Sequence, residues 1–359
     1  MAAKFPTAQL RTLTDITQQD YEENQTPEGQ YIGNVINVLA TTNKILQDIP
    51  FLPANYGMDK FWHKIVTSYP KTYWARYGRG IPPSKGTFAS VEETSGKLKS
   101  TCQVEKEMAD DRSGGNAGAR YQLILDQEKL HMEALAQDMA RHLFYGDKKV
   151  TPEAFDGLAV RYSSLSPDEP SSKNIIDCGG TGNNLTSIWL IAWGDGCHGF
   201  YPKFGQAGVT AKHSTQFLPD PDGYPIEYYH TEFKWQIGLA IPDWRKVVRL
   251  VNIDVDQLMS GQGIGQPDLS KPGNNNLIMR LNQARSLLDN VRKPSDRVFW
   301  YGNNDVQSAL SALALRENSK VVRFEQTTNA LGAVPDLNAF GITFRQTDAL
   351  SSQENRLTV

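Results

Sequence analysis

Residues 116–146, NAGARYQLILDQEKLHMEALAQDMARHLFYG, form the longest regular pattern in the chain. The apolar residues recur at steps of three, four or seven positions, at Tyr121, Leu125, Met132, Leu135, Met139 and Leu143. With 3.6 residues per turn, this spacing places them along one face of an α-helix. Gly146 is a typical C-terminal stop. The stretch therefore predicts one long helix whose apolar face packs on the rest of the protein.

The same stretch also contains a spacing used by metalloenzymes. Glu128 and His131 have the Glu-x-x-His separation of carboxylate-bridged di-metal proteins, and Glu227 and His230 repeat it. The second copy lies in YPIEYYHTEFKW, whose aromatic alternation predicts a strand, and on a strand residues three apart point to opposite faces. We therefore expect Glu128 and His131 at the polar edge of the helix, with His131 hydrogen-bonded or solvated. A metal-dependent enzyme using Glu128 and His131 is the remaining catalytic alternative.

Other catalytic patterns are incomplete. Cys197 and His198 are adjacent among glycines, which favours a turn over a nucleophile with its base. The glycines of SGQGIGQ lack the spacing of a dinucleotide fingerprint, and neither a P-loop nor a GxSxG elbow occurs. The sequence therefore predicts no catalytic residues, no cofactor and no metal.

The segment before the long helix predicts an arm and a hairpin. Residues 1–27 are polar, and an amphipathic helix is expected from Gly29 to Ile49, ended by Pro50. Alternation at Tyr73–Gly78, a tip GRGIPPSKGT and a strand-like stretch at Lys97–Val104 then predict a long hairpin with a flexible tip. Long exposed strands need a cover, for which a partner subunit is the natural candidate.

This hairpin mixes aromatic and charged residues. Such a mixture is typical of single-stranded nucleic-acid sites, and also of protein interfaces, where Arg, Tyr and Trp dominate the binding energy. Lys97, Lys99 and Glu105 belong to the same region. We favour the protein interface, and the candidate inter-subunit contacts are Tyr73, Trp74, Arg76, Tyr77, Arg79, Lys85, Glu92 and Glu93.

Residues 150–265 predict a β-rich region, followed by a compact α/β unit. The expected strands lie in FDGLAVRYSSL, TSIWLIAW, FYPKF, EYYHTEFKWQIGLAI and KVVRLVNI. After the loop SGQGIGQPDLSKPGNNN we expect a helix from Asn276 to Val291 and a strand at RVFWYG. A helix capped by Asn304 or Asp305 and a final strand in FGITFRQTDAL complete the unit.

Composition excludes several classes of protein. Of 359 residues, 39% are hydrophobic and 21% charged, which is typical of a globular chain. The formal net charge of −3 provides no basic excess, so any contact with nucleic acid should be weak. Three separated cysteines without a CxxC pair predict reduced thiols. No run predicts a secretion signal or a membrane span.

The order of arm, hairpin, long helix, β-rich middle and α/β end resembles the major capsid proteins of tailed bacteriophages, with the Hong Kong 97 fold. It looks closest to the group found in short-tailed phages. The similarity runs from about Leu52 to Ala349. It is carried by YWARYGRG, EKEMADDRSGGNAGARYQLILDQEKLHMEALAQDMARHLFYGD, FDGLAVRYSSL, IIDCGGTGNNLTSIWLIAWG with FYPKF, and WQIGLAIPDWRKVVRLVNID.

The resemblance implies an α+β fold of this capsid type. It divides the chain into an N-terminal arm 1–57, an extended β-hairpin loop 58–110, a peripheral domain 111–265 with a spine helix 116–146, an axial α/β domain 266–350 and a C-terminal tail 351–359. In many relatives the axial unit precedes the last peripheral strands, whereas DRVFWYGNNDVQSALSAL comes nearly last here. The division of residues 150–265 between the two domains therefore stays open.

The resemblance also implies a function. The chain would be a major capsid protein that self-assembles, as hexamers and pentamers, into an icosahedral shell around packaged double-stranded DNA. Its partners would be further copies of itself, a scaffolding protein during assembly, a portal protein at one vertex, an optional decoration or cement protein, and packaged DNA that it contacts weakly and non-specifically. Its place would be the virion, assembled in the host cytoplasm. An encapsulin-like nanocompartment shell, loaded with a cargo enzyme, is the alternative with the same fold.

Overall fold

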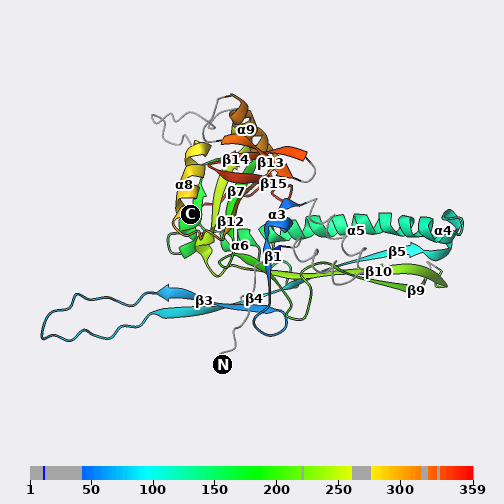
Figure 1. The fold of residues 1–359 in the computed structure, drawn as a ribbon, viewed down its shortest axis with the longest axis horizontal. Coiled ribbons are helices and arrows are strands. Elements are labelled where there is room, and N and C mark those ends of the chain that lie inside the picture. The colour runs from blue at the N-terminus through cyan, green and yellow to red at the C-terminus, as the bar shows by residue number, and fades with distance from the viewer. Residues whose placement is uncertain are drawn as a thin grey trace.

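The computed structural model describes residues 11–12, 43–219, 222–260, 276–316, 322–329 and 332–358. Within these ranges the molecule is elongated (Figure 1). A body of helices and sheet carries two projections that point in opposite directions, a β-hairpin on one side and a helix with a β-sheet on the other. Most of the expected arm at 1–57, and the expected helix between Gly29 and Asn43, lie outside the described residues.

A seven-stranded sheet forms the centre of the body. Its order is β13-β14-β15-β12-β7-β11-β6. The strands are β6 Ile175–Asp177, β7 Leu185–Trp193, β11 Val247–Asp254, β12 Arg297–Gly302, β13 Val322–Asn329, β14 Gly332–Ala339 and β15 Ile342–Gln346. Strands on both sides of residue 265 thus share one sheet. A domain boundary at 265 would cut through it.

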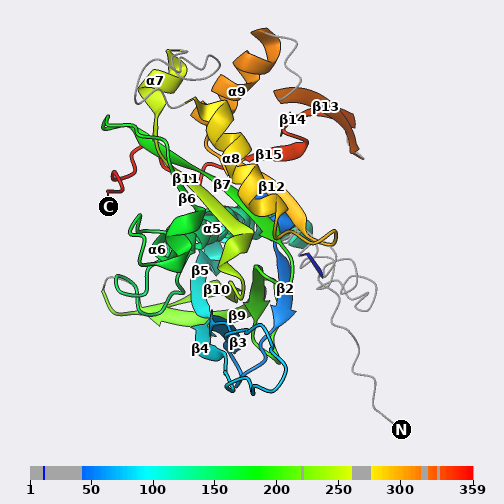
Figure 2. The same ribbon diagram turned by 90° about the vertical axis from the view of Figure 1, so that its left-hand side faces the viewer.

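Strand β7 divides two hydrophobic cores. All nine of its residues are buried, because both faces of the sheet are covered. Trp189, Ile191 and Trp193 pack in one core with the C-terminal half of α5 Ala117–Tyr145. Ile188, Leu190 and Ala192 pack in the other with α8 Leu277–Asp289 and α9 Asn304–Arg316, which lie across the opposite face (Figure 2).

Helix α5 confirms the long helix expected from the sequence. Its 29 residues begin after Asn116, whose side chain accepts a hydrogen bond from the Gly118 amide at 2.9 Å. The expected apolar face is buried at Met132, Leu135, Met139 and Leu143, whereas Tyr121, near the exposed end, is not. Gly146 caps the C-terminus of the helix, and a side chain there would collide with the carbonyl oxygens of His142 and Phe155.

The second projection is built from α5 and a six-stranded sheet. Its longest strand, β10 Pro225–Ala240, pairs antiparallel with β5, β9 and β8. The other members are β1 Arg11–Thr12, β2 Pro50–Pro53, β5 Gly96–Glu105, β8 His198–Tyr201 and β9 Thr210–Pro219. Helix α4 Lys106–Arg112 leads from β5 into α5. The expected strand in EYYHTEFKWQIGLAI is confirmed as β10.

The hairpin is present, but its strands are not where the sequence placed them. It consists of β3 Lys60–Ser68 and β4 Thr87–Thr94, joined by residues 69–86. Tyr73–Gly78, expected to be a strand, lies in this joining segment, where Pro70 and the glycines and prolines of GRGIPP prevent a regular ladder. The stretch Lys97–Val104 is a strand, yet it belongs to β5 and pairs with β10.

Two further expectations are corrected locally. FDGLAVRYSSL contains the short helix α6 Leu158–Arg161 and no strand. Asn276 caps α8, as expected from its position, but α9 is capped by Asn303, whose side chain accepts from the Val306 amide at 3.0 Å. Helix α3 Lys44–Asp48 coincides with the last part of the expected helix from Gly29 to Ile49. The remaining short helices are η1 Pro170–Asn174, η2 Trp244–Lys246 and α7 Val255–Met259.

Candidate inter-subunit surfaces

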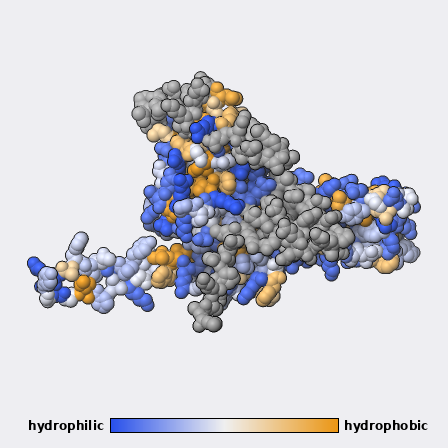
Figure 3. All heavy atoms as spheres, in the orientation of Figure 1, coloured by the Kyte–Doolittle hydropathy of each residue, from blue (hydrophilic) through white to orange (hydrophobic). Residues whose placement is uncertain are grey.

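The loop at the hairpin tip, residues 69–86, carries most of the contact candidates. Trp74 and Tyr77 are fully exposed, and Tyr73 is about half exposed. The loop contains no acidic residue, and its basic residues are Lys71, Arg76, Arg79 and Lys85. Figure 3 shows the hairpin extending away from the body, so these side chains have solvent around them. The tip is thus a positively charged aromatic surface that no part of the described body covers.

The two acidic candidates on β4 have different environments. Glu92 is exposed and pairs with Lys60 across the hairpin. Glu93 is only 5% exposed, and the guanidinium of Arg161 on α6 holds it, with Nη2 at 2.8 Å from Oε2. Arg161 also donates to the carbonyl oxygens of Asp156 and Leu239. Glu93 therefore fastens the hairpin to its own body, and we no longer count it as a contact candidate.

Lys97 and Lys99, which the sequence grouped with the hairpin, lie on the outer face of the six-stranded sheet. Lys99 pairs with Glu232 on β10 at 2.6 Å, and Lys234 lies opposite Lys99 in the ladder. The alternate residues of β5, such as Ser100, face α5. This arrangement makes a polar sheet face opposite the helix.

Several apolar residues that the sequence did not suggest as contacts are exposed. On the second projection they are Met108, Tyr121, Leu130, Phe217 and Tyr224, and near the hairpin base they are Tyr56, Met58 and Phe204. Exposed aromatic groups of this kind are typical of interfaces between proteins. Tyr56, Met58, Phe204, Phe217 and Tyr224 fall on strand ends and turns, where no periodicity reveals them, whereas Met108, Tyr121 and Leu130 lie on helices.

Glu128 is buried, contrary to the expected polar edge. It is 1% exposed, accepts a hydrogen bond from Thr231 Oγ1 at 2.6 Å, and lies 3.4 Å from Nδ1 of His213. His131, by contrast, is hydrogen-bonded as expected, with Nδ1 at 2.8 Å from Ser100 Oγ. The expectation for Glu128 failed because the sheet beneath α5 supplies polar groups that a helix pattern cannot reveal.

The two Glu-x-x-His copies do not form a common site. Glu227 lies on strand β10, as predicted, and pairs with Lys106 at 2.7 Å. Across the described ranges, no group of three or more His, Cys, Asp and Glu side chains is close enough to hold a metal ion.

Cys197 lies in the predicted turn. Its amide and carbonyl bond to those of Gly194, at 3.1 and 2.9 Å. Complete burial raises the pKa of the Cys197 thiol well above its ordinary value, so the thiolate that nucleophilic chemistry requires does not form near neutral pH.

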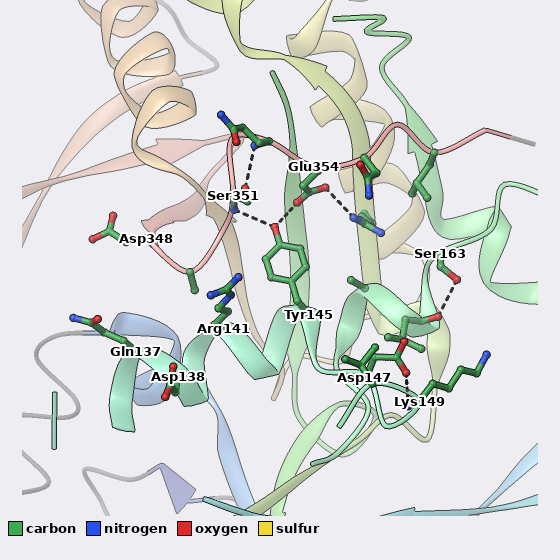
Figure 4. A pocket seen from close by; sticks show the side chains of 18 of the residues that line it. Gln137, Asp138, Arg141, Tyr145, Asp147, Lys149, Ser163, Asp348, Ser351 and Glu354 are labelled. Atoms are coloured by element: carbon green, nitrogen blue, oxygen red, sulfur yellow. Dashed lines mark hydrogen bonds and ion pairs between the residues drawn. The ribbon is translucent and has the colours of Figure 1, made fainter. Parts of the chain in front are cut away.

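A cleft of about 1120 Å³ lies between the C-terminal half of α5, α6 and residues 348–357. Glu354 is the centre of its polar network (Figure 4). It accepts from Tyr145 and Ser187, and Arg249 Nη2 lies 2.9 Å from its Oε2. Asn252 binds the amide and carbonyl of Leu357. These contacts hold the C-terminal segment against β7 and β11, so the polar network stabilises the fold.

No helix in the part of the chain that the structure describes has the length and apolar character to cross a membrane.

Comparison with known proteins gives a family and a fold. A family model described as major capsid protein GP7 matches residues 26–358. A chain in the cryo-electron microscopy structure of bacteriophage Epsilon15 is 24% identical, with a TM-score of 0.62 over 87% of this chain and 88% of that one. The bacteriophage JBD30 capsid matches at 11% identity and a TM-score of 0.45, over 86% and 91%. A Synechococcus elongatus encapsulin matches at 11% identity and 0.39, over 70% and 92%. No curated protein sequence matches.

Proposed function

This chain belongs to the family of the major capsid protein GP7, and we propose that its copies assemble through hexamers and pentamers into the icosahedral shell of a tailed phage. The family match over residues 26–358 is the observation that carries the proposal. The fold shared with a chain of Epsilon15 supports it over most of the described structure.

The hairpin has the features of an arm that contacts a neighbouring copy of the chain. Its tip has exposed aromatic and cationic side chains and lies away from the body. A contact between this arm and a different surface of a second copy is heterologous, and heterologous contacts generate closed rings when the rotation between subunits closes. We therefore propose Tyr73, Trp74, Arg76, Tyr77, Arg79, Lys85 and Glu92 as contacts between subunits.

The sheet topology suggests a division of the subunit. We propose that residues 1–57 form the arm, that β3 and β4 with residues 69–86 form the extended loop, and that α4, α5, β5, β9 and β10 form the peripheral part. The seven-stranded sheet with α8 and α9 then forms the axial part. On this division the axial part includes β6, β7 and β11, which precede residue 265.

The partners follow from this role as proposals. We expect a scaffolding protein during assembly, a portal protein at one vertex, an optional decoration or cement protein, and weak contact with packaged double-stranded DNA. The net charge of −3 supports weak contact with DNA. The site of action would be the virion, after assembly in the host cytoplasm, and the role would be structural rather than enzymatic.

Electron microscopy of the full chain, expressed with its scaffolding partner, tests the proposal. Closed particles with icosahedral symmetry are expected. Monomers or small rings alone, at concentrations where related shells form, would overturn it, and a co-purified cargo enzyme would indicate a nanocompartment instead.

A further inference from the structure

Two buried histidines meet where the hairpin joins the body. His63 on β3 is 8% exposed and His198 on β8 is 1% exposed. Within the described residues, neither ring nitrogen of either histidine has a hydrogen-bond partner of normal geometry. Buried polar groups without partners are rare, because each costs free energy on folding. Because burying these two histidines costs free energy, we expect the pair to serve a purpose other than stabilising the fold.

Aromatic rings surround these histidines. The Phe61 ring lies 4.8 Å from that of His198, edge to face, and 6.4 Å from that of His63. Phe200 is 5.6 Å from Phe61, and Ala54 and Ala240 complete this small cluster. We name the set of Phe61, His63, His198 and Phe200 the root box. It joins β3 of the hairpin to β8 of the six-stranded sheet.

The charges around the root box balance only while both imidazoles are neutral. His63 faces the ion pair between Glu93 on β4 and Arg161 on α6. His198 faces His63, the side chain of Asp195 and the carbonyls of Gly194 and Asp195. Because Arg161 already pairs with Glu93 and Lys293 with Asp195, two added protons would have no carboxylate left to balance them in this buried site. Charged groups in such surroundings are strongly disfavoured.

We propose that the root box is a proton-operated hinge. While both histidines are neutral, the hairpin root packs on the body and the hairpin keeps one angle. When both are charged, the root box opens, His63 and His198 reach water, and the hairpin becomes free to change its angle. The inference concerns the isolated chain, and it bears on assembly only through the proposed role of the hairpin as an arm.

The direction of the pH dependence follows from burial. Desolvation lowers the pKa of His198 to about 4 and lowers that of His63 below its ordinary value. In an open root box both would return toward about 6.5. The packed state thus binds fewer protons, so it is fully favoured above the ordinary value and is lost as the pH falls toward 4. For His198 alone, the difference corresponds to roughly 300-fold in the equilibrium.

The hinge can be tested on the full chain in solution. The native cysteines are buried, so dyes can be attached selectively to Ser84→Cys at the hairpin tip and Ala134→Cys on α5. Energy transfer between the dyes is measured from pH 8 to pH 4, with circular dichroism alongside. We expect the distance to change below about pH 6 while the helix signal is retained.

Two double variants and one control make the test specific. His63→Gln with His198→Gln, and His63→Phe with His198→Phe, should each abolish the change. His142→Gln, a partly exposed histidine on α5, should leave it intact. The same pH profile in the double variants as in the native chain, or a distance change that coincides with loss of helix, would overturn the proposal. The assay needs no shell, so its outcome is independent of the test of assembly.

Discussion

The hydroxyl of Tyr301 donates a hydrogen bond to the carboxylate of Asp48, with 2.9 Å between Oη and Oδ2. This bond ties helix α3, which follows the N-terminal segment, to strand β12 in the central sheet. Trp193 Nε1 donates to the same hydroxyl at 2.8 Å, and Arg345 Nε lies 3.5 Å from Asp48. A buried carboxylate therefore anchors α3 to the central sheet.

Asp48 should make stability depend on pH. Burial raises its pKa to about 6, although Arg345 and the Tyr301 hydrogen bond act in the opposite direction. An acid with a raised pKa contributes stability that is present below its unfolded value, near 3.9, and is lost as the pH rises through 6. Asp48→Asn removes the titrating group and with it this pH dependence. The melting temperature of the variant minus that of the native chain, measured from pH 4.5 to pH 7.5, should therefore rise with pH. A constant difference between the two proteins would contradict the assignment.

The apolar face of α5 should tolerate no charge. Met132→Asp places an unpaired carboxylate between α5 and the sheet, where Met132 is 2% exposed, and should lower the free energy of unfolding by about 3 to 5 kcal/mol. Leu130→Asp, on the exposed side of the same helix, is the matched control and should change it by less than about 1 kcal/mol. Denaturant titration measures both. Equal effects would mean that the face of α5 has been assigned wrongly.

How much of α5 was predictable depends on which residue is considered. Met132 and Met139 could be assigned to the core because a 3.6-residue period is a local property of the sequence. Glu128 could not, because its burial depends on Thr231 and His213, about a hundred residues away on β10 and β9. A helix pattern describes which residues share a face. It contains no information on the polar groups that the opposite sheet provides.

The hairpin shows the same limit for strands. Alternation in Tyr73–Gly78 predicted a strand, but a strand must pair with a second strand through backbone hydrogen bonds. Pro70 and the glycines and prolines that follow prevent such pairing. Lys97 and Lys99 were placed on the hairpin by proximity in sequence, whereas their pairing with β10 is a long-range contact. The ion pair that buries Glu93 could not be foreseen for a similar reason. Its partner Arg161 lies on the short helix α6, in a stretch where the sequence pattern predicted a strand.

Glu128 should be a structural carboxylate. Glu128→Ala would remove the carboxylate that accepts from the Thr231 hydroxyl and leave a small void under α5, and should cost about 2 to 4 kcal/mol. Glu133→Ala, an exposed glutamate one turn further along α5, should be nearly neutral. Thermal and denaturant unfolding of the two variants make the comparison. A neutral Glu128→Ala, or stoichiometric metal in the purified native chain that this variant removes, would contradict the structural reading.

The hairpin tip should matter for assembly and not for folding. Trp74 is fully exposed and has no role in either hydrophobic core, so Trp74→Ala should leave the circular dichroism spectrum and the melting temperature unchanged. If Trp74 enters a pocket on a neighbouring copy, its removal should cost about 2 kcal/mol per contact, which raises the concentration needed for assembly by at least tenfold. Val150→Ala, an exposed apolar residue on the body, is the control for loss of surface area alone. Sedimentation and electron microscopy over a concentration series measure the threshold. Native yields of closed particles from the Trp74 variant, at the native threshold concentration, would show that the tip is not an interface.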